Sequence, residues 1–231
     1  MGIDIHANVH KIHEVLEKAA AKAGRNPETI KLMAVSKTID VERMNLALEA
    51  GIQHLGENRV QEGQAKKPRL SSRPFTFHLI GPLQKNKVNR AIEIFDWIQT
   101  VESVELAAKI NQVCERTGKS MPVLIEVNQG KEPLKSGVLE ENVRDLVEKM
   151  SLFKNLSLRG LMSVPPFFED PEDVRPYFAR LRHLAETLVE LRIANVSMDE
   201  LSMGMSHDFP VAIEEGATIV RIGTAIFGPR L

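Results

Sequence analysis

Cysteine is nearly absent from the sequence, and neither sign of charge dominates it. Cys114 has no second cysteine to pair with, so an intramolecular disulfide is excluded and a reducing compartment is expected. The 30 Lys and Arg residues and the 31 Asp and Glu residues give a formal net charge of −1, which argues against nucleic acid or a membrane surface as a broad partner. The sequence also lacks an apolar run typical of a signal peptide or a transmembrane span. These absences predict a cytoplasmic protein.

The sequence contains no linker rich in Pro, Gly or Ser and no low-complexity segment. With 231 residues, 43% of them hydrophobic, the chain can bury a full core. We therefore expect residues 1–231 to form one domain. Its first residues show the pattern of a helix that ends at Gly24.

Short β-like runs alternate with helical patterns along the rest of the chain. The predicted strands are residues 31–37, 53–56, 75–81, 97–101, 122–128, 157–162, 200–203 and 218–223. The predicted helices include residues 41–50, 104–117, 140–150, 171–191 and 209–215. Helices between successive strands imply parallel pairing with right-handed crossovers. The α/β pattern therefore favours a closed (β/α)8 TIM barrel with an extra N-terminal helix over an open doubly wound sheet.

Lys37 stands at the exit of the first predicted strand, directly after an apolar run. A desolvated ammonium group loses its hydration, so a buried lysine there is neutralised, paired or chemically bound. A lysine of lowered pKa is also the nucleophile that forms a Schiff base with an aldehyde. Taken alone, the position favours a strand-end lysine that turns its amine to water. The interpretation therefore depends on what else the mouth of the barrel contains.

Two loops near the end of the chain have the composition of phosphate sites. Barrels of this type place active sites at the carboxyl ends of the strands, and often bind phosphate after strands seven and eight. The loop after strand seven carries Ser206 and Asp208, either of which would cap the helix that follows. The loop after strand eight offers N–H groups beside Gly223 and the hydroxyl of Thr224. Either loop alone fits an ordinary turn, whereas the pair favours a phosphorylated ligand.

Arg221 is predicted to point into the barrel. Alternation along the last predicted strand puts it on the face opposite Val220 and Ile222, and the outer face of a barrel strand packs against helices. A buried guanidinium needs an acceptor. Glu57 and Glu126 are candidate partners within the protein, and an acceptor atom on a bound ring is the functional alternative. A lysine, a permanent cation and a phosphate cradle would then share one mouth.

Five segments of the sequence resemble one known family. They are AVSK at residues 34–37, HLGENRVQE at 54–62, FHLIGPLQKNK at 77–87, LSMGMS at 201–206 and VRIGTAIFG at 220–228. In this order they resemble the pyridoxal phosphate homeostasis proteins, which are single-barrel relatives of the alanine racemase N-terminal domain. The resemblance runs from about residue 8 to the end of the chain.

The resemblance implies pyridoxal 5′-phosphate (PLP) bound as an internal aldimine on Lys37. It also implies Asn58 near the cofactor ring and Arg221 facing the pyridine nitrogen. The strength of PLP as an electron sink depends on protonation of that nitrogen. Because an arginine can only donate, it leaves the nitrogen neutral and the sink weak, which restricts carbanion chemistry to easy cases such as proton exchange at an amino-acid α-carbon.

At the phosphate, the resemblance implies Ser206, Gly223 and Thr224. His78 projects from the third predicted strand and is expected to line the ring pocket, with a packing role as the alternative. We predict no catalytic residue and no metal ligand. The complete set of predicted cofactor-binding residues is Lys37, Asn58, His78, Ser202, Met205, Ser206, Arg221, Gly223 and Thr224.

Racemisation needs a base on each face of a planar intermediate. In alanine racemase-like enzymes the second base is a tyrosine from a β-rich domain. The sequence ends at Leu231 after the eighth unit, so we expect no such domain, and its single tyrosine, Tyr177, is expected to be half-buried on a helix. The resemblance therefore implies a monomeric PLP-binding protein that buffers or delivers the cofactor, with PLP-dependent apoenzymes as partners.

Two other functions stay open as alternatives. One is a small PLP-dependent amino-acid racemase or related enzyme in which water or His78 replaces the second base. The other is a barrel that binds a different phosphorylated metabolite without an aldimine. Residues 162–170 would cover the mouth as a lid or pack onto its rim. Lys85, Lys87 and Arg90 would form a solvated helix face or a docking patch for an enzyme that accepts the cofactor.

Overall fold

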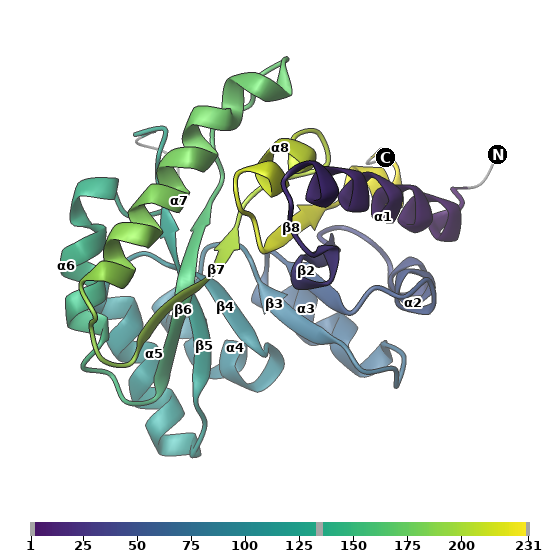
Figure 1. The fold of residues 1–231 in the computed structure, drawn as a ribbon. Helices are drawn as coiled ribbons and strands as arrows, with labels where there is room; N and C mark the ends of the chain where they lie inside the picture. The colour runs from purple at the N-terminus through teal and green to yellow at the C-terminus, as the bar shows by residue number, and fades with distance from the viewer. Residues whose placement is uncertain (1–2, 133–135, 230–231) are drawn as a thin grey trace.

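Eight parallel strands form the centre of the molecule and close into a barrel in chain order (Figure 1). The computed structural model describes residues 3–132 and 136–229. The strands are β1 (Lys31–Val35), β2 (His54–Glu57), β3 (Thr76–Leu79), β4 (Trp97–Val101), β5 (Met121–Val127), β6 (Leu156–Ser163), β7 (Val196–Ser202) and β8 (Ile219–Ile222). Because β1 pairs with both β2 and β8, the sheet has no open edge there. The prediction of a (β/α)8 barrel is confirmed, and the open sheet is excluded.

Helices fill the connections and cover the outside of the barrel. They are α1 (Ile5–Lys22), α2 (Val41–Glu49), α3 (Val60–Lys66), α4 (Val88–Ile94), α5 (Val104–Thr117), α6 (Glu140–Met150), α7 (Arg175–Glu190), α8 (Phe209–Glu214) and α9 (Thr224–Phe227), with short 3-10 turns η1 (Pro27–Thr29), η2 (Lys67–Arg69), η3 (Lys85–Lys87) and η4 (Pro171–Val174). The helices predicted over 104–117 and 140–150 match α5 and α6. The one predicted over 171–191 is divided into η4 and α7, because Pro176 lacks the N–H that would continue the first turn.

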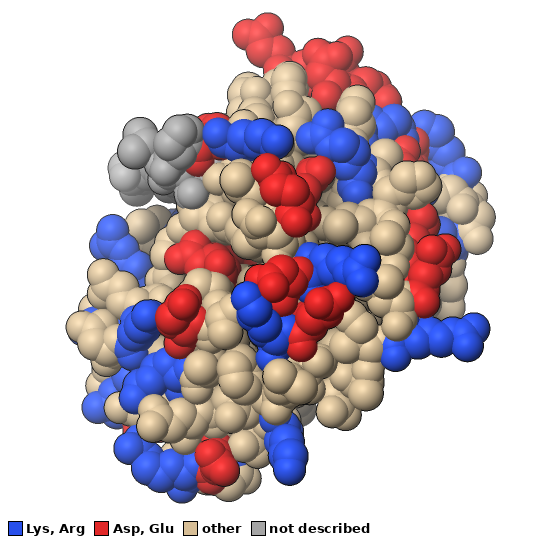
Figure 2. Space-filling model, turned by 90° about the vertical axis from the view of Figure 1, so that its left-hand side faces the viewer, with Lys and Arg blue, Asp and Glu red and all other residues tan. Residues whose placement is uncertain are grey.

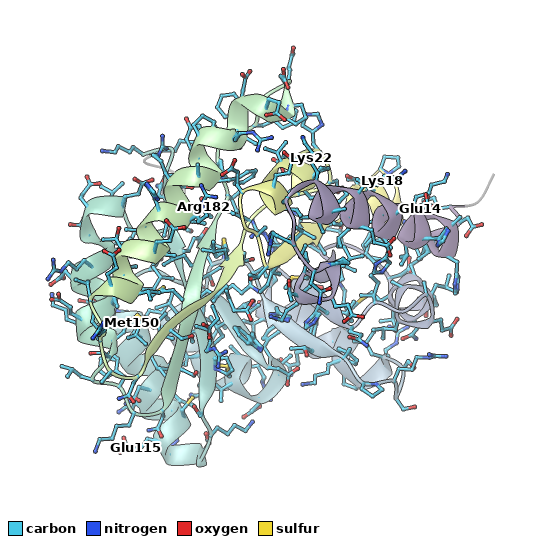
Figure 3. The ribbon with its side chains drawn as sticks, in the orientation of Figure 1. Glu14, Lys18, Lys22, Glu115, Met150 and Arg182 are labelled. Carbon is cyan, nitrogen blue, oxygen red and sulfur yellow. The ribbon has the colours of Figure 1, made fainter. Side chains whose placement is uncertain are left out.

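The predicted N-terminal helix, α1, covers the part of the outer barrel wall near β7 and β8, where the following helices are short. The connection after β7 contains only the six-residue α8, and the four-residue α9 follows β8. α1 contacts both of them as well as α2. Figure 3 shows Glu14, Lys18 and Lys22 on its outward side. Its inward side follows the helical repeat and joins the apolar core outside the barrel through Ile5, Val9, Ile12 and Leu16.

The inside of the barrel has its own small apolar cluster. It consists of Met33, Leu124, Met162 and Ile219, and it is separate from the larger core between the strands and the helices. Val220 and Ile222 belong to that larger core. The alternation predicted for β8 is therefore confirmed, and it turns the side chain of Arg221 inward together with Ile219.

Basic and acidic side chains are intermixed on the face of the molecule shown in Figure 2. Lys85 and Arg90 are exposed, and Arg90 pairs with Glu93 at 2.7 Å, as expected for a solvated helix face. Among residues 3–132 and 136–229, no helix combines the length and the apolar character needed to cross a bilayer.

Gly160 lies where β6 changes register against both of its neighbours. Its φ is +152°, and a Cβ at this position would stand 1.9 Å from the carbonyl oxygen of Glu200 in β7. No side chain fits in that space, so glycine is required for β6 and β7 to pair through the bulge.

Replacing Gly160 with alanine should destabilise the barrel much more than the same change at Gly118. Gly118 also has a positive φ, +64°, at the end of α5, but no atom lies within 4 Å of an added Cβ. We expect a loss of about 1 kcal/mol for Gly118→Ala. For Gly160→Ala we expect about 3 kcal/mol or more, because two backbones must separate. Urea unfolding measures both losses, and equal values would contradict the steric account.

Candidate functional site

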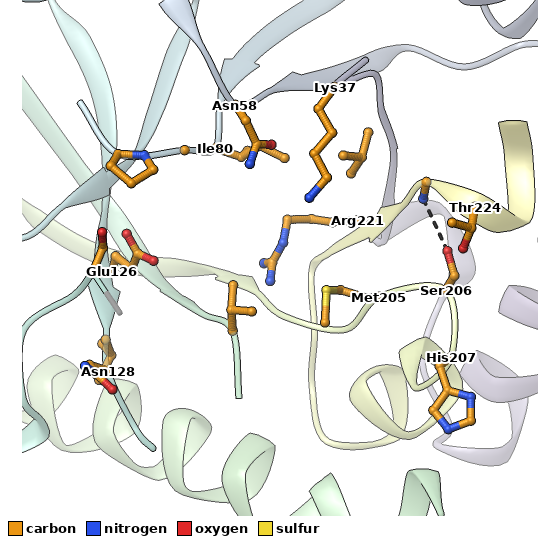
Figure 4. Close-up of a pocket in the computed structure, with 17 residues that line it drawn as sticks. Lys37, Asn58, Ile80, Glu126, Asn128, Met205, Ser206, His207, Arg221 and Thr224 are labelled. Carbon is orange, nitrogen blue, oxygen red and sulfur yellow. Dashed lines mark hydrogen bonds between the residues drawn. The ribbon is translucent and has the colours of Figure 1, made fainter. Parts of the chain in front are cut away.

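A cavity of about 430 Å³ opens at the carboxyl ends of the strands (Figure 4). Parallel strands in a closed barrel bring all of these ends to one mouth, so residues far apart in sequence meet there. Most of the predicted cofactor-binding residues line this cavity. They are Lys37, Asn58, Met205, Ser206, Arg221, Gly223 and Thr224.

Lys37 lies in the turn after β1 rather than within the strand, and its side chain extends into the cavity (Figure 4). The next residue, Thr38, has φ +64°, a left-handed conformation that is unusual for a β-branched residue. Its backbone N–H donates to the Glu62 carboxylate at 3.2 Å. The preceding Ser36 is fully buried and donates through its backbone N–H to the carbonyl of Gly56. The backbone on both sides of Lys37 is thus held by β2 and α3.

Glu57, at the end of β2, anchors the same turn. Its carboxylate accepts from Lys66 Nζ at 2.7 Å and from the hydroxyl of Ser36 at 3.2 Å. Lys66 also donates to the backbone carbonyl of Ser36 at 2.9 Å and to Glu62 at 3.0 Å. Burial raises the pKa of Glu57, while the bond from Lys66 opposes that rise. Glu57 is therefore not the partner of Arg221, because α3 brings an ammonium group closer to it.

Arg221 is 5% exposed and sits in the centre of the cavity wall (Figure 4). Its Nη1 donates to the hydroxyl of Ser202 and its Nη2 to the backbone carbonyl of Ser163, both at 2.7 Å. Burial lowers the pKa of Arg221 to about 10, and Glu126 opposes that shift. The guanidinium therefore keeps its charge at neutral pH.

Glu126 is a cavity residue that sequence analysis considered only as an ion-pair partner. Its Oε2 is buried and has no hydrogen-bond partner among the described residues. Burial, with help from the nearby charge of Glu102, raises the pKa of Glu126 to about 7, against the influence of Arg221. Alternation along β5, with Leu124 inward, places Glu126 and Asn128 toward the mouth. That alternation is the signal that could have found them.

Ser206 joins the two predicted phosphate loops. Its hydroxyl oxygen accepts from the backbone N–H of Gly223 at 3.2 Å and of Ala225 at 3.3 Å. Asp208 accepts instead from the N–H of Met205, at 2.6 Å. Asp208 occupies the N-cap position of α8, as one of the two predicted candidates, but neither side chain makes a capping hydrogen bond. The Ser206 side chain bonds across to the backbone that follows β8, and that of Asp208 bonds back into its own loop. The result is a small pocket of hydroxyl and N–H groups.

His78 and Ser202 do not line the cavity. His78 is 1% exposed and lies deeper in the barrel, in hydrogen-bond contact with His54 and Gln99. Ser202 is fully buried behind Arg221. Both side chains point to the inside of the barrel, where they bond to Gln99, and the register between the strands sets them below the mouth.

The loop after β6 lies on the rim of the cavity. Val164 lines the cavity, whereas Phe167 is 73% exposed and its ring stands 5.3 Å from that of His207. His207 also lines the cavity, and its Nε2 is 3.0 Å from the carbonyl oxygen of Glu169. Phe168 packs against the ring of Tyr177 at 5.6 Å. Of the two predicted arrangements, a lid over the mouth and packing on the rim, this structure shows the loop packed on the rim.

Comparison with known proteins places this site in a family. The model of the alanine racemase N-terminal domain matches residues 5–230. The pyridoxal phosphate homeostasis protein of Aquifex aeolicus is 44% identical over 95% of this chain and 96% of its own length. The Escherichia coli K12 protein of the same name is 38% identical over 98% of this chain and 97% of its own.

The chain belongs to the pyridoxal phosphate homeostasis protein family.

Solved structures agree with this membership. The related protein PipY of Synechococcus elongatus was solved with PLP bound. It is 36% identical to this chain with a TM-score of 0.81, and the match covers 93% of this chain and 100% of PipY. An alanine racemase of Clostridium difficile is 16% identical with a TM-score of 0.72 and shares the fold. The match with the racemase covers 98% of this chain but only 56% of the racemase. The homeostasis proteins therefore match the present chain from end to end, whereas the racemase is much longer.

Glu126→Gln should stabilise the protein much more at pH 8 than at pH 5. The folded state holds the Glu126 proton up to about pH 7, whereas an unfolded glutamate releases it near 4.5. Ionisation therefore favours the unfolded state increasingly as pH rises from 4.5 to 7, and glutamine removes this effect. The gain at pH 8 should approach about 3 kcal/mol.

Urea unfolding of the wild type and the Glu126→Gln variant at both pH values measures this gain. The exposed Glu28→Gln is the control for loss of one carboxyl group. A gain for Glu126→Gln that is the same at pH 5 and pH 8 would contradict the assigned titration.

Proposed function

We propose that the protein binds PLP in the cavity, covalently through Lys37 Nζ, and takes part in the intracellular buffering or delivery of this cofactor. One observation carries the proposal: the lysine shares its cavity with a buried guanidinium and with a hydroxyl and N–H cradle. The family membership and the PLP bound to the related PipY support it. We expect PLP-dependent apoenzymes to receive the cofactor, and the protein to act as a cytoplasmic monomer.

The residues of the cavity match the chemical groups of PLP. Ser206 and Thr224 offer hydroxyl donors to a phosphate, and the backbone N–H of Gly223, which donates to Ser206 Oγ in this structure, would donate to the phosphate in its place. Arg221 offers guanidinium donors to an acceptor atom on a ring. The buried Oδ1 of Asn58 has no hydrogen-bond partner among the described residues and is suited to a donor on the ligand. When bound, PLP supplies an aldehyde that combines reversibly with amines and a ring that withdraws electrons.

The positions of two residues favour the carrier over the racemase. His78, the proposed substitute for the second base, is buried beneath the cavity floor by its bonds to His54 and Gln99. Tyr177 is half-buried on α7, between the ring of Phe168 and the guanidinium of Arg180. Neither side chain lines the cavity in which Lys37 would hold the cofactor.

The first test is the visible absorption of the purified protein with PLP. The wild type should be yellow, and borohydride should bleach it and leave the reduced cofactor on the peptide that contains Lys37, as seen by mass spectrometry. Lys37→Ala should be colourless. Lys85→Ala, an exposed lysine outside the cavity, is the matched control and should behave like the wild type. A colourless wild type would contradict the proposal, and so would label at another lysine.

A second test separates the carrier from an enzyme. A carrier should activate a PLP-dependent apoenzyme with its own bound cofactor, even when free PLP is trapped. It should introduce little deuterium from solvent at the α-carbon of added amino acids. Proton NMR of an amino-acid mixture in deuterium oxide measures this exchange. Turnover of many equivalents by the wild type, lost in Lys37→Ala, would favour the racemase alternative.

A further inference from the structure

A chain of buried hydrogen bonds runs from the cavity wall down into the barrel. Arg221 Nη1 is 2.7 Å from Ser202 Oγ, which is 2.7 Å from Gln99 Oε1. Gln99 Nε2 is 3.1 Å from His78 Nδ1, and His78 Nε2 is 3.1 Å from His54 Nδ1. Five residues, one from each of the strands β2, β3, β4, β7 and β8, thus form one continuous path.

The bonds along this path all run in one direction, away from Arg221. A guanidinium can only donate, so Ser202 Oγ accepts from Arg221, and the Ser202 hydroxyl donates its own hydrogen to Gln99 Oε1. Gln99 therefore turns its oxygen to Ser202 and its amide hydrogens to His78. His78 accepts at Nδ1, carries its hydrogen on Nε2, and donates to His54. The path thus starts at a permanent cation and assigns one amide orientation to Gln99 and one tautomer to His78.

The burial of these groups makes the direction costly to change. Ser202 and Gln99 are fully buried, and His78 is 1% exposed. Burial lowers the pKa of His78 well below its ordinary value, and the charges of His54 and Lys31 act in the same sense. A neutral His78 can accept from Gln99, whereas a charged one would place two donors face to face. A reversed amide would place the amide hydrogens of Gln99 against the Ser202 hydroxyl hydrogen and its oxygen against the unprotonated Nδ1 of His78, so both partners would have to rearrange away from water.

The other contact of Arg221 lies on the opposite side of its guanidinium. Nη2 donates to the backbone carbonyl of Ser163, and the Ser163 hydroxyl donates to Gln129 at 2.9 Å. A backbone carbonyl is positioned by the strand, so this bond keeps its acceptor whatever side chains surround it. The bond to Ser202 differs, because a serine hydroxyl can rotate unless its hydrogen has an acceptor. Gln99 supplies that acceptor.

We propose that Gln99 is a positioning residue for cofactor binding, which fixes the Ser202 hydroxyl as an acceptor and so holds Arg221 in one orientation at the cavity wall. The inference rests on the proposed function, because it assigns a role in PLP binding to a side chain that does not reach the cavity. His78 completes the arrangement by occupying the amide hydrogens of Gln99. The polar path inside the barrel thereby becomes part of the binding site.

The test compares two substitutions of Gln99. Gln99→Leu removes both polar atoms at similar size and should weaken PLP binding about tenfold, as measured by absorbance titration. Gln99→Glu keeps an oxygen opposite Ser202 but offers no amide hydrogen to His78 Nδ1, so it should recover only part of the affinity that Gln99→Leu loses. Ile98→Val, a buried neighbour on the outer face of β4, controls for packing loss and should bind PLP like the wild type.

A double-mutant cycle shows whether Gln99 acts through Ser202. Ser202→Ala should weaken binding about as much as Gln99→Leu, and the double variant should be no weaker than either single one. Additive losses would overturn the inference, and so would a Gln99→Leu protein that binds PLP as tightly as the wild type.

A matching cycle in urea unfolding, with Gln99→Leu and Arg221→Met, needs no cofactor. Effects on stability that are not additive would support the path, and additive ones would overturn it. A wild type that fails to bind PLP would overturn the proposed function, whatever this second cycle gives.

Discussion

The burial of one guanidinium is the constraint on which the interior of this barrel depends. Arg221 carries a permanent charge and is 5% exposed, so the protein must supply the acceptors that water would otherwise provide. It does so with the hydroxyl of Ser202 and the carbonyl of Ser163. Apolar side chains fill another part of the interior, around Met33 and Ile219. The interior of the barrel therefore has two parts. One is filled by apolar side chains, and the other contains the chain of hydrogen bonds that begins at Arg221.

A second network decides which lysine reaches the cavity. Lys66 is held by Glu57, Glu62 and the carbonyl of Ser36, and these same groups hold the turn that presents Lys37. The two ammonium groups near the mouth thus have different roles. One is paired in a buried network that gives shape to a loop, and the other extends into the space where a ligand would bind.

Glu126 adds a titratable group to the cavity beside the residues predicted to bind the cofactor. Its carboxyl group is buried near a like charge and a cation, and burial outweighs the attraction of Arg221. It therefore changes charge close to neutral pH, at the wall of the cavity. The Asn58 oxygen and the Glu126 oxygen are both buried there without a protein partner among the described residues, which is a cost that a bound ligand can offset.

The sequence by itself determined the order of strands and helices, the inward direction of Arg221 and the meeting of Lys37 with the two phosphate loops at one mouth. These features follow from local periodicity and from the rule that parallel strands end on the same side. Only the tertiary structure decided that Glu57 pairs with Lys66, that Ser206 bonds across to the backbone after β8, and that His78 and Ser202 lie beneath the cavity. Alternation along a strand predicts the face on which a residue lies. The depth of that residue in the barrel and its bonding partners depend on the register between neighbouring strands, which the sequence of one strand does not specify.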